Sequence, residues 1–180
     1  QINRWSYAEA KAIDETLSLL YFREFGLRVR IGRFFNTVGP KQAGEYGMVI
    51  PRFVMAATQN KVINVFGTGE QTRCFCHVDD AVKAIIMLTD SQSTVGDVFN
   101  IGSEEEITIS NLAKKVIKIT KSTSEIEYIP YTDAYGKSYE DVQRRKPDIS
   151  KIKETVGWSP TRNLDGIISD VYESYLSGKI

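Results

Sequence analysis

The chain has 180 residues, and its 23 Lys and Arg balance its 23 Asp and Glu, which argues against a protein dedicated to nucleic acid or to anionic membranes. A hydrophobic fraction of 42% and an aromatic fraction of 11% are typical of a folded globular domain rather than of a disordered chain. No apolar run approaches the roughly 20 residues that cross a bilayer, and two cysteines are too few for a secreted disulfide scaffold, so we expect a cytoplasmic protein.

The first part of the chain predicts a long helix followed by a strand. Residues 5–25 repeat apolar side chains at helical spacing, and Gly26 is suited to end that helix. Polar and apolar side chains alternate along residues 28–35, which predicts a strand. The glycines and the proline of residues 36–47 predict a loop. A short helix is expected at residues 49–59.

Strands and helices alternate through the remaining residues. The expected strands lie at residues 62–66, 72–78, 98–101, around 107 and 126–129. The expected helices lie at residues 80–90, 111–120, a short stretch from 148 or 150, and 164–176, with Asp79, Asp80 and Ser110 as N-caps. Residues 130–147 are polar and rich in tyrosine, which predicts a surface loop. The alternation indicates an α/β fold.

One pair of residues on the first helix suggests acid–base chemistry. Tyr7 and Lys11 are four residues apart, so a phenol and an ammonium share one helix face. The ammonium favours the phenolate, which can accept a proton from a sugar hydroxyl while hydride leaves the same carbon. The spacing alone is not specific, because Tyr175 and Lys179 repeat it, and a partly buried tyrosine beside a solvated lysine is the simpler alternative.

Several other constellations do not complete a site. Cys74, Cys76 and His77 are close in sequence, but no second Cys or His cluster exists to complete a tetrahedral metal site, so no metal is expected. The sequence contains no Gly-x-Ser-x-Gly nucleophile elbow and no Walker loop. The dinucleotide fingerprint Gly-x-Gly-x-x-Gly is also missing, since Gly67-Thr-Gly69 lacks the third glycine.

A series of segments in fixed order carries a stronger signal. They are Tyr7-Ala-Glu-Ala-Lys11, Arg33-Phe-Phe-Asn36-Thr-Val-Gly39-Pro40, Val49-Ile-Pro51-Arg52-Phe53, Val65-Phe66-Gly67-Thr-Gly69-Glu-Gln-Thr-Arg73, His77-Val-Asp79-Asp80-Ala81, Phe99-Asn100-Ile101-Gly102 and Arg144-Arg145-Lys-Pro-Asp148. Together they resemble the extended short-chain dehydrogenases/reductases, a family of NAD-dependent epimerases and dehydratases that act on nucleotide sugars. The resemblance implies NAD as cofactor, a nucleotide-diphosphate sugar, with a UDP-sugar favoured, as substrate, and a homodimer.

The resemblance also implies residue roles. Tyr7 would be the catalytic acid or base, and Lys11 would bind the nicotinamide ribose and keep Tyr7 ionised. The same two residues and Asn36 would contact the cofactor. The residues that would contact the substrate nucleotide or its diphosphate are Asn36, Val49, Asn64, Phe66, Arg73, Asn100, and one or both of Arg144 and Arg145. A planar guanidinium matches phosphate oxygens, and an aromatic ring can stack on a base.

Ordinary structural roles remain open for several of these residues. Arg73 could face solvent from a strand, Phe66 could belong to the core, and Asn36 could serve the turn before Gly39. The basic run Arg144–Lys146 could simply be solvated.

The resemblance implies the end of a Rossmann-like domain at residues 1–47 and mainly a small α/β substrate-binding domain at residues 48–180, with segments of about 72–101 returning to the Rossmann-like sheet. The family's glycine-rich strand and its catalytic Ser or Thr would precede Gln1, so we expect the C-terminal part of a longer enzyme, inactive alone, that lacks the N-terminal nucleotide-binding half.

The expected activity runs through a 4-keto sugar. A UDP-sugar epimerase is favoured, with a UDP-glucuronate decarboxylase or a dTDP-glucose 4,6-dehydratase as alternatives. A non-catalytic nucleotide-binding or interaction module is the alternative from another class.

Overall fold

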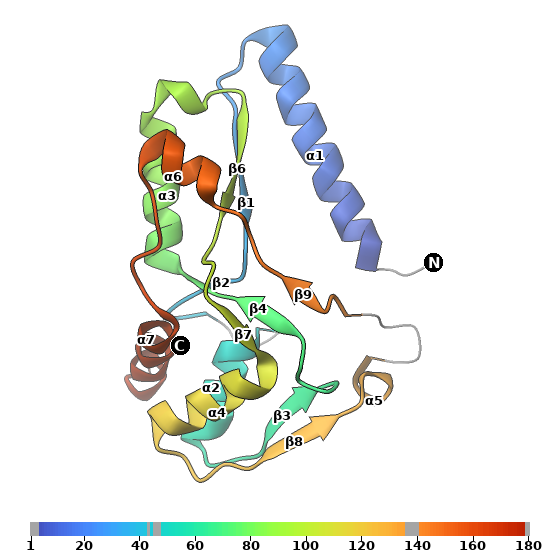
Figure 1. Ribbon diagram of the computed structural model, residues 1–180, viewed down its shortest axis with the longest axis vertical. Helices are drawn as coiled ribbons and strands as arrows, with labels where there is room; N and C mark the ends of the chain where they lie inside the picture. The colour runs from blue at the N-terminus through green and yellow to red at the C-terminus, as the bar shows by residue number, and fades with distance from the viewer. Residues whose placement is uncertain (1–3, 43, 45–47, 136–140, 179–180) are drawn as a thin grey trace.

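The structure, a computed structural model, describes residues 4–42, 44, 48–135 and 141–178 (Figure 1). The helices are α1 (Arg4–Phe25), α2 (Val49–Thr58), α3 (Val78–Asp90), α4 (Ile109–Thr120), α5 (Tyr131–Tyr135), α6 (Ser150–Val156) and α7 (Leu164–Leu176), with a 3-10 turn at Gln92–Thr94. The strands are β1 (Arg30–Phe34), β2 (Thr37–Val38), β3 (Ile63–Phe66), β4 (Thr72–Cys74), β5 (Cys76–His77), β6 (Asp97–Ile101), β7 (Glu106–Thr108), β8 (Ile126–Ile129) and β9 (Arg144–Arg145).

Most strand pairs are parallel and join segments that are far apart in the chain. β1 pairs with β6, β2 with β5, and β3 with β8, all in parallel. β4 lies between antiparallel β7 and parallel β9. Parallel neighbours need long crossover connections, and here helices supply them. Strands and helices therefore alternate as expected for an α/β protein.

Helix α1 stands beside the β1–β6 pair and is joined to β1 through Gly26 (Figure 1). Gly26 has a φ of +67°, and its N–H donates to the Phe22 carbonyl at 3.1 Å, so it ends the helix as predicted. The Phe22 ring packs on Gly96, where an added Cβ would lie 2.2 Å from the ring. This contact fixes the C-terminal end of α1 to the turn before β6.

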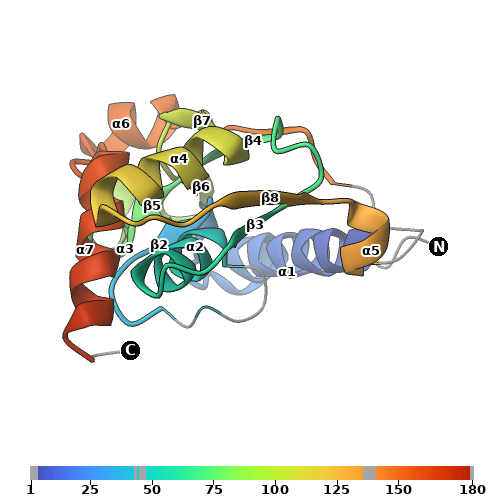
Figure 2. The same cartoon turned by 90° about the horizontal axis from the view of Figure 1, so that it is seen from below.

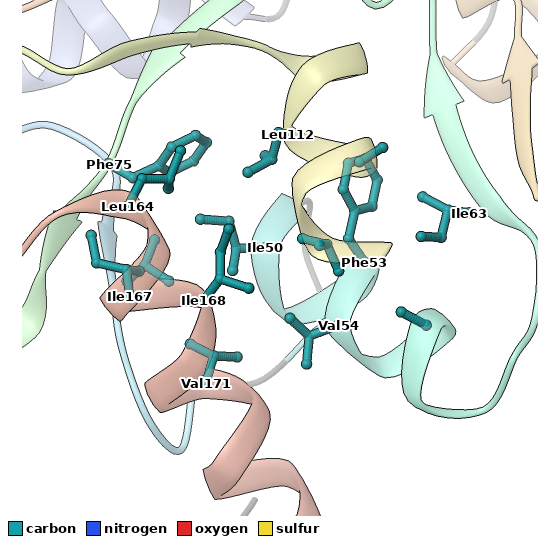
Figure 3. Close-up of a cluster of buried hydrophobic side chains, with 14 of the residues drawn as sticks. Ile50, Phe53, Val54, Ile63, Phe75, Leu112, Leu164, Ile167, Ile168 and Val171 are labelled. Atoms are coloured by element: carbon teal, nitrogen blue, oxygen red, sulfur yellow. The ribbon is translucent and has the colours of Figure 1, made fainter. Parts of the chain in front are cut away.

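The larger hydrophobic cluster lies where α2, α4 and α7 pack together beside β3 (Figure 3). Ile50 and Phe53 from α2 meet Leu112 from α4 and Ile168 from α7, and each is at most 1% exposed. Burial of each such side chain stabilises the fold by roughly 1.5–3 kcal/mol. Seen from below, β3 and β8 run side by side past α2 toward α5 (Figure 2).

A second cluster lies between α3, α6 and β6. Phe99, Ile101, Ala84 and Ile152 are buried there together with Trp158. The Trp158 indole N–H donates to the Asp80 carbonyl at 3.0 Å, so the loop after α6 is bound to the start of α3. The described residues thus form two separate hydrophobic clusters.

The N-cap predictions for α3 are wrong. His77 is the N-cap, because its Nδ1 accepts from the Asp79 N–H at 3.1 Å, and Asp79 and Asp80 lie in the first turn. Asp80 is 1% exposed and accepts hydrogen bonds from the Thr161 N–H, the Thr161 hydroxyl and the Arg162 N–H at 2.7–3.0 Å. Its carboxylate serves a distant loop rather than its own helix.

The cap of α4 also differs, since Thr108 accepts from the Asn111 N–H and Ser110 instead accepts from the Tyr128 hydroxyl. The strand predicted at 72–78 divides at Phe75, because β4 pairs with β7 and β9 while β5 pairs with β2. The loop predicted at 130–147 contains α5 and β9, while residues 136–140 lie outside the described residues.

Candidate active site

A cavity of about 640 Å³ lies between α1 and β1. One face of α1 contributes Tyr7, Lys11, Asp14, Glu15 and Ser18, β1 and the residue after it contribute residues 30–35, and β9 contributes Arg145. The cavity therefore brings together Tyr7 and Lys11 with Arg145, three of the residues proposed from the sequence.

Tyr7 and Lys11 are both exposed on the side of α1 that faces this cavity. Tyr7 is 71% exposed, and the Lys11 Nζ lies 2.8 Å from the Asp14 carboxylate. The hydrogen bond from Lys11 to Asp14 and the charge of that carboxylate raise the pKa of Lys11 above its ordinary value. Lys11 is therefore a permanent cation at neutral pH, and an exposed ion pair of this kind is easily exchanged for another partner.

An ion pair joins the two walls of the cavity. The Arg33 guanidinium on β1 donates to both carboxylate oxygens of Glu15 on α1, at 2.8 and 2.6 Å. The hydrogen bond from Arg33 lowers the pKa of Glu15 below its ordinary value. A bidentate pair fixes the mutual orientation of its partners, so this contact sets the position of Tyr7 and Lys11 over β1.

The two arginines of β9 have different surroundings. Arg145 lines the cavity, with its guanidinium carbon 5.6 Å from the centre of the Phe35 ring. Arg144 donates to both carboxylate oxygens of Glu106 at 2.9 and 3.0 Å. That pairing, with a further hydrogen bond from Thr72, lowers the pKa of Glu106 to about 2. Successive residues of a strand point to opposite faces. Arg145 therefore faces the cavity, whereas Arg144 points to the other face and pairs with Glu106.

Arg73 is engaged within the fold. Its Nη2 lies 2.8 Å from the Asp141 carboxylate, and its Nη1 donates to the carbonyls of Thr72 and Val142. The sequence offered no sign of Asp141, because the two partners are 68 residues apart.

The two asparagines proposed as ligands both donate to backbone carbonyls. Asn36, directly before β2 and with a φ of +34°, donates to the Cys74 carbonyl at 2.8 Å. Asn100 lies opposite Arg33 in the β1–β6 ladder and donates to the Asp148 carbonyl at 2.9 Å. Both hydrogen bonds use the side-chain Nδ2 atom as donor. A ligand contact through the amide oxygen is therefore compatible with these bonds.

The remaining proposed residues lie on α2 and β3. The guanidinium of Arg52 stacks 4.3 Å from the centre of the Phe66 ring and donates to the Asn64 carbonyl at 3.3 Å. Val49 is the first residue of α2 and packs against the larger hydrophobic cluster. Arg52 was not among the residues proposed from the sequence, although it lies in one of the segments that carry the resemblance.

The two cysteines lie in the interior of the protein. Cys74 and Cys76 are fully buried, and burial raises their pKa values to about 11 and about 12. Across the part of the chain that the structure describes, no three His, Cys, Asp or Glu side chains are grouped so that they could hold a metal ion. In the same part, no helix is long and apolar enough to cross a membrane.

Comparison with known proteins shows the family to which the chain is related. A family described as GDP-mannose 4,6 dehydratase matches residues 2–171. The chain belongs to this family of extended short-chain dehydrogenases/reductases. The resemblance drawn from the sequence is thereby confirmed, as is the Rossmann-like α/β fold that it implied.

Curated relatives within the family include decarboxylases. The chain is 44% identical over 158 residues to UDP-N-acetyl-alpha-D-glucosaminuronate decarboxylase of Bacillus cytotoxicus, a match that covers 87% of this chain and 49% of that protein. It is 38% identical over 161 residues to UDP-glucuronic acid decarboxylase 6 of Arabidopsis thaliana, a match that covers 89% of this chain and 45% of that protein. The chain thus spans about half the length of the curated relatives it matches.

Solved structures of the family superpose closely. UDP-glucose 4-epimerase from Thermotoga maritima gives a TM-score of 0.87 at 30% identity, covering 97% of this chain and 54% of that one. dTDP-glucose 4,6-dehydratase from Bacillus anthracis gives a TM-score of 0.84 at 26% identity, covering 96% of this chain and 52% of that one.

Proposed function

We propose that the chain is the C-terminal part of an NAD-dependent enzyme that acts on a UDP-sugar through a 4-keto intermediate. The observation that carries this proposal is that Tyr7, Lys11 and Arg145 line one cavity. A proton-transferring phenol, a cation beside it and an anion-binding guanidinium are the groups that such a reaction needs from this part of the protein.

Tyr7 and Lys11 fit the nicotinamide-ribose end of NAD. Both face the cavity, and the Lys11 ammonium pairs with the exposed carboxylate of Asp14, a contact that ribose hydroxyls can replace. Asn36, in the connection between β1 and β2, is the third residue that we propose to contact the cofactor. When bound, NAD would supply the oxidation at C4 of the sugar.

Residues of this chain would carry out the proton transfer at the C4 hydroxyl of the sugar. Tyr7, as phenolate, accepts the proton of the C4 hydroxyl and later returns it. The Lys11 ammonium stabilises the phenolate by its charge, because an opposite charge nearby favours the ionised form. Arg145 binds the substrate diphosphate and so holds the sugar at the other side of the cavity.

The fate of the keto sugar is proposed from the relatives. Because the 44% identical relative and the 38% identical one are decarboxylases of UDP-uronic acids, we favour decarboxylation of a UDP-hexuronate. The 30% identical Thermotoga maritima protein makes 4-epimerisation, the activity favoured from the sequence, the second candidate. A 4,6-dehydratase is third, on the weaker likeness to the Bacillus anthracis protein.

We propose a Rossmann-like end at residues 1–47 and mainly a substrate domain at residues 48–180, with segments of about 72–101 returning to the Rossmann-like sheet. The parallel pairing of β6 with β1 supports this return. We place the nucleotide near Val49, Asn64 and Phe66 on α2 and β3, with Asn100 and Arg144 as further contacts. We also propose a cytoplasmic homodimer, which would cover apolar side chains that are exposed on α1, among them Leu17 and Tyr21.

The test uses the protein expressed from its complete reading frame and supplied with NAD, UDP-glucuronate, UDP-N-acetylglucosaminuronate or UDP-glucose. Carbon dioxide release identifies a decarboxylase, and a changed sugar configuration identifies an epimerase. Tyr7→Phe should lower turnover by about 100-fold or more while UDP still binds, since proton transfer contributes this much. Tyr175→Phe, at the same spacing from Lys179 but bonded to Gln59, should leave turnover unchanged.

Binding of UDP without turnover of any of these sugars would favour the non-catalytic module instead. We further expect negligible turnover from the 180 residues alone.

A further inference from the structure

Glu106 on β7 binds side chains from two other strands of the same sheet. Its carboxylate accepts from Nε and Nη2 of Arg144 on β9 at 2.9 and 3.0 Å, and its Oε1 also accepts from the Thr72 hydroxyl on β4. The hydrogen bond from Arg144, followed by that from Thr72, lowers the pKa of Glu106 to about 2, so the side chain is a carboxylate at neutral pH. One anion therefore connects β7, β4 and β9.

The register of β9 places its two side chains on opposite faces of this sheet. β9 pairs in parallel with β4, with Thr72 opposite Arg144 and Arg73 opposite Arg145. Successive residues of a strand point to opposite faces. Arg144 therefore lies on the face that carries Thr72 and Glu106, and Arg145 lies on the other face, where it lines the cavity.

β9 itself does little to select this register. It consists of two arginines, and it lies at the edge of the three-stranded sheet. Register is weakly specified in a short strand that is polar on both faces, and a slip by one residue turns every side chain to the opposite face. Such a slip would exchange Arg144 and Arg145, which have the same charge and the same chemistry.

The hydrogen bonds on either side of β9 do not distinguish these two arginines. Arg73 donates to the Val142 carbonyl before the strand, and Asn100 donates to the Asp148 carbonyl after it. Both acceptors are backbone atoms, so these bonds limit the movement of the segment without selecting a side chain. The bidentate pair with Glu106 selects one guanidinium, because its geometry fixes the orientation of both partners.

We infer that Glu106 is a positioning residue for substrate binding, which selects the register of β9 so that Arg145 rather than Arg144 faces the cavity. This inference rests on the proposed function, in which Arg145 binds the diphosphate. Glu106 itself contacts no ligand in this account, so its effect on binding passes through Arg145. The Nη1 of Arg144 takes no part in the pair, so a further contact of Arg144 with the nucleotide is compatible with it.

The test is a double-mutant cycle in the protein expressed from its complete reading frame and loaded with NAD. Calorimetry measures the Kd of UDP for wild type, Glu106→Gln, Arg145→Ala and the double variant. Arg145→Ala should raise Kd by about tenfold or more, the effect of one lost charged hydrogen bond. Glu106→Gln should raise Kd by about fivefold in the wild type and by less than about 1.5-fold in the Arg145→Ala background, because the two residues act through one contact.

Two variants of Thr72 test the same anion from β4. Thr72→Val removes the hydroxyl that donates to Glu106 and should raise the Kd of UDP by about threefold, the effect of one lost hydrogen bond. Thr72→Ser keeps a hydroxyl and should leave Kd within about 1.5-fold of the wild type. This pair of variants decides the inference if the Glu106→Gln protein does not fold.

Asp97→Asn is the matched control for the loss of an ion pair. Asp97 on β6 pairs with Lys151 on α6, the helix that follows β9, and their side chains are 42% and 51% exposed. The pair between Arg144 and Glu106 is similarly open to solvent, with 69% and 23% exposed. Exposed pairs contribute little to stability, so both variants should fold, and only Glu106→Gln should weaken UDP binding.

The outcomes separate the inference from the function on which it rests. The inference alone is overturned by an equal rise in Kd in both backgrounds, by an unchanged Kd in folded Glu106→Gln, or by an equal rise from Asp97→Asn. If Glu106→Gln does not fold, equal Kd values for Thr72→Val and Thr72→Ser overturn it. Because the readout is UDP binding, a protein that binds UDP but turns over no sugar overturns only the catalytic proposal. A wild type that does not bind UDP overturns both.

Discussion

Arg33 on β1 holds both carboxylate oxygens of Glu15 on α1, at 2.8 and 2.6 Å, and this pair connects the helix that carries Tyr7 to the strand opposite it. The side chains are 55% and 23% exposed, so the pair contributes at most about 1 kcal/mol to the free energy of unfolding. Its importance lies in orientation, since Tyr7 and Lys11 are on the same helix.

Glu15→Gln should therefore affect catalysis more than stability. We expect kcat/KM to fall about threefold to tenfold, because a displaced catalytic group loses rate, while the unfolding free energy changes by less than about 1 kcal/mol. Asp165→Asn is the control, since it breaks another exposed ion pair, between α7 and Lys115 of α4. Steady-state kinetics and urea unfolding measure both quantities, and equal loss of activity in the two variants would contradict the orientation role.

Asp80 should make the fold sensitive to acid. Burial raises the pKa of Asp80, but the hydrogen bonds from Arg162 and Thr161 outweigh it, so the pKa lies below the ordinary value. A depressed folded pKa stabilises the protein above the unfolded value of about 3.9, and this stability is lost as pH falls through the folded pKa.

Asp80→Asn should consequently cost about 1–3 kcal/mol at pH 7 and less as the pH approaches the folded pKa. Thermal unfolding of both proteins between pH 7 and pH 3 measures the difference. A constant difference over this range would show that Asp80 has the same pKa folded and unfolded.

Replacement of Gly96 by alanine should destabilise the protein more than replacement of Gly157, a glycine with similar backbone angles. Its φ is +77°, and a Cβ would lie 2.2 Å from the Phe22 ring, whereas Gly157, at +72°, has open space. Gly96→Ala should cost about 1–3 kcal/mol more than Gly157→Ala, because it adds overpacking to the shared backbone strain. Equal unfolding free energies for the two variants would mean that Phe22 moves aside without cost.

The two thiols should resist modification in the folded protein. Burial raises the pKa values of Cys74 and Cys76 to about 11 and about 12, so almost no reactive thiolate exists at pH 8. An aromatic disulfide reagent at that pH should label them slowly in buffer and rapidly in guanidinium chloride. Rapid labelling without denaturant would contradict this burial.

Much of the architecture is predictable from local sequence. The helix at 164–176 and the strand at 126–129 are confirmed at the residues expected, and Gly26 ends α1 as its position suggested. Periodicity and end signals act over a few residues, so they can be read along the chain. The N-cap predictions for α3 are wrong because the buried Asp80 binds a loop 81 residues away. His77 caps the helix instead.

The family, the α/β class and the placement of Tyr7 and Lys11 on one face of a helix can be predicted from the sequence, because ordered motifs and helical spacing are properties of the chain as written. Which arginine faces the cavity depends on the folded structure. Arg144 and Arg145 are neighbours of the same chemistry, and their surroundings differ because Glu106 pairs with Arg144 and Phe35 lies against Arg145. Those contacts join residues that are far apart along the chain, and folding alone brings them together.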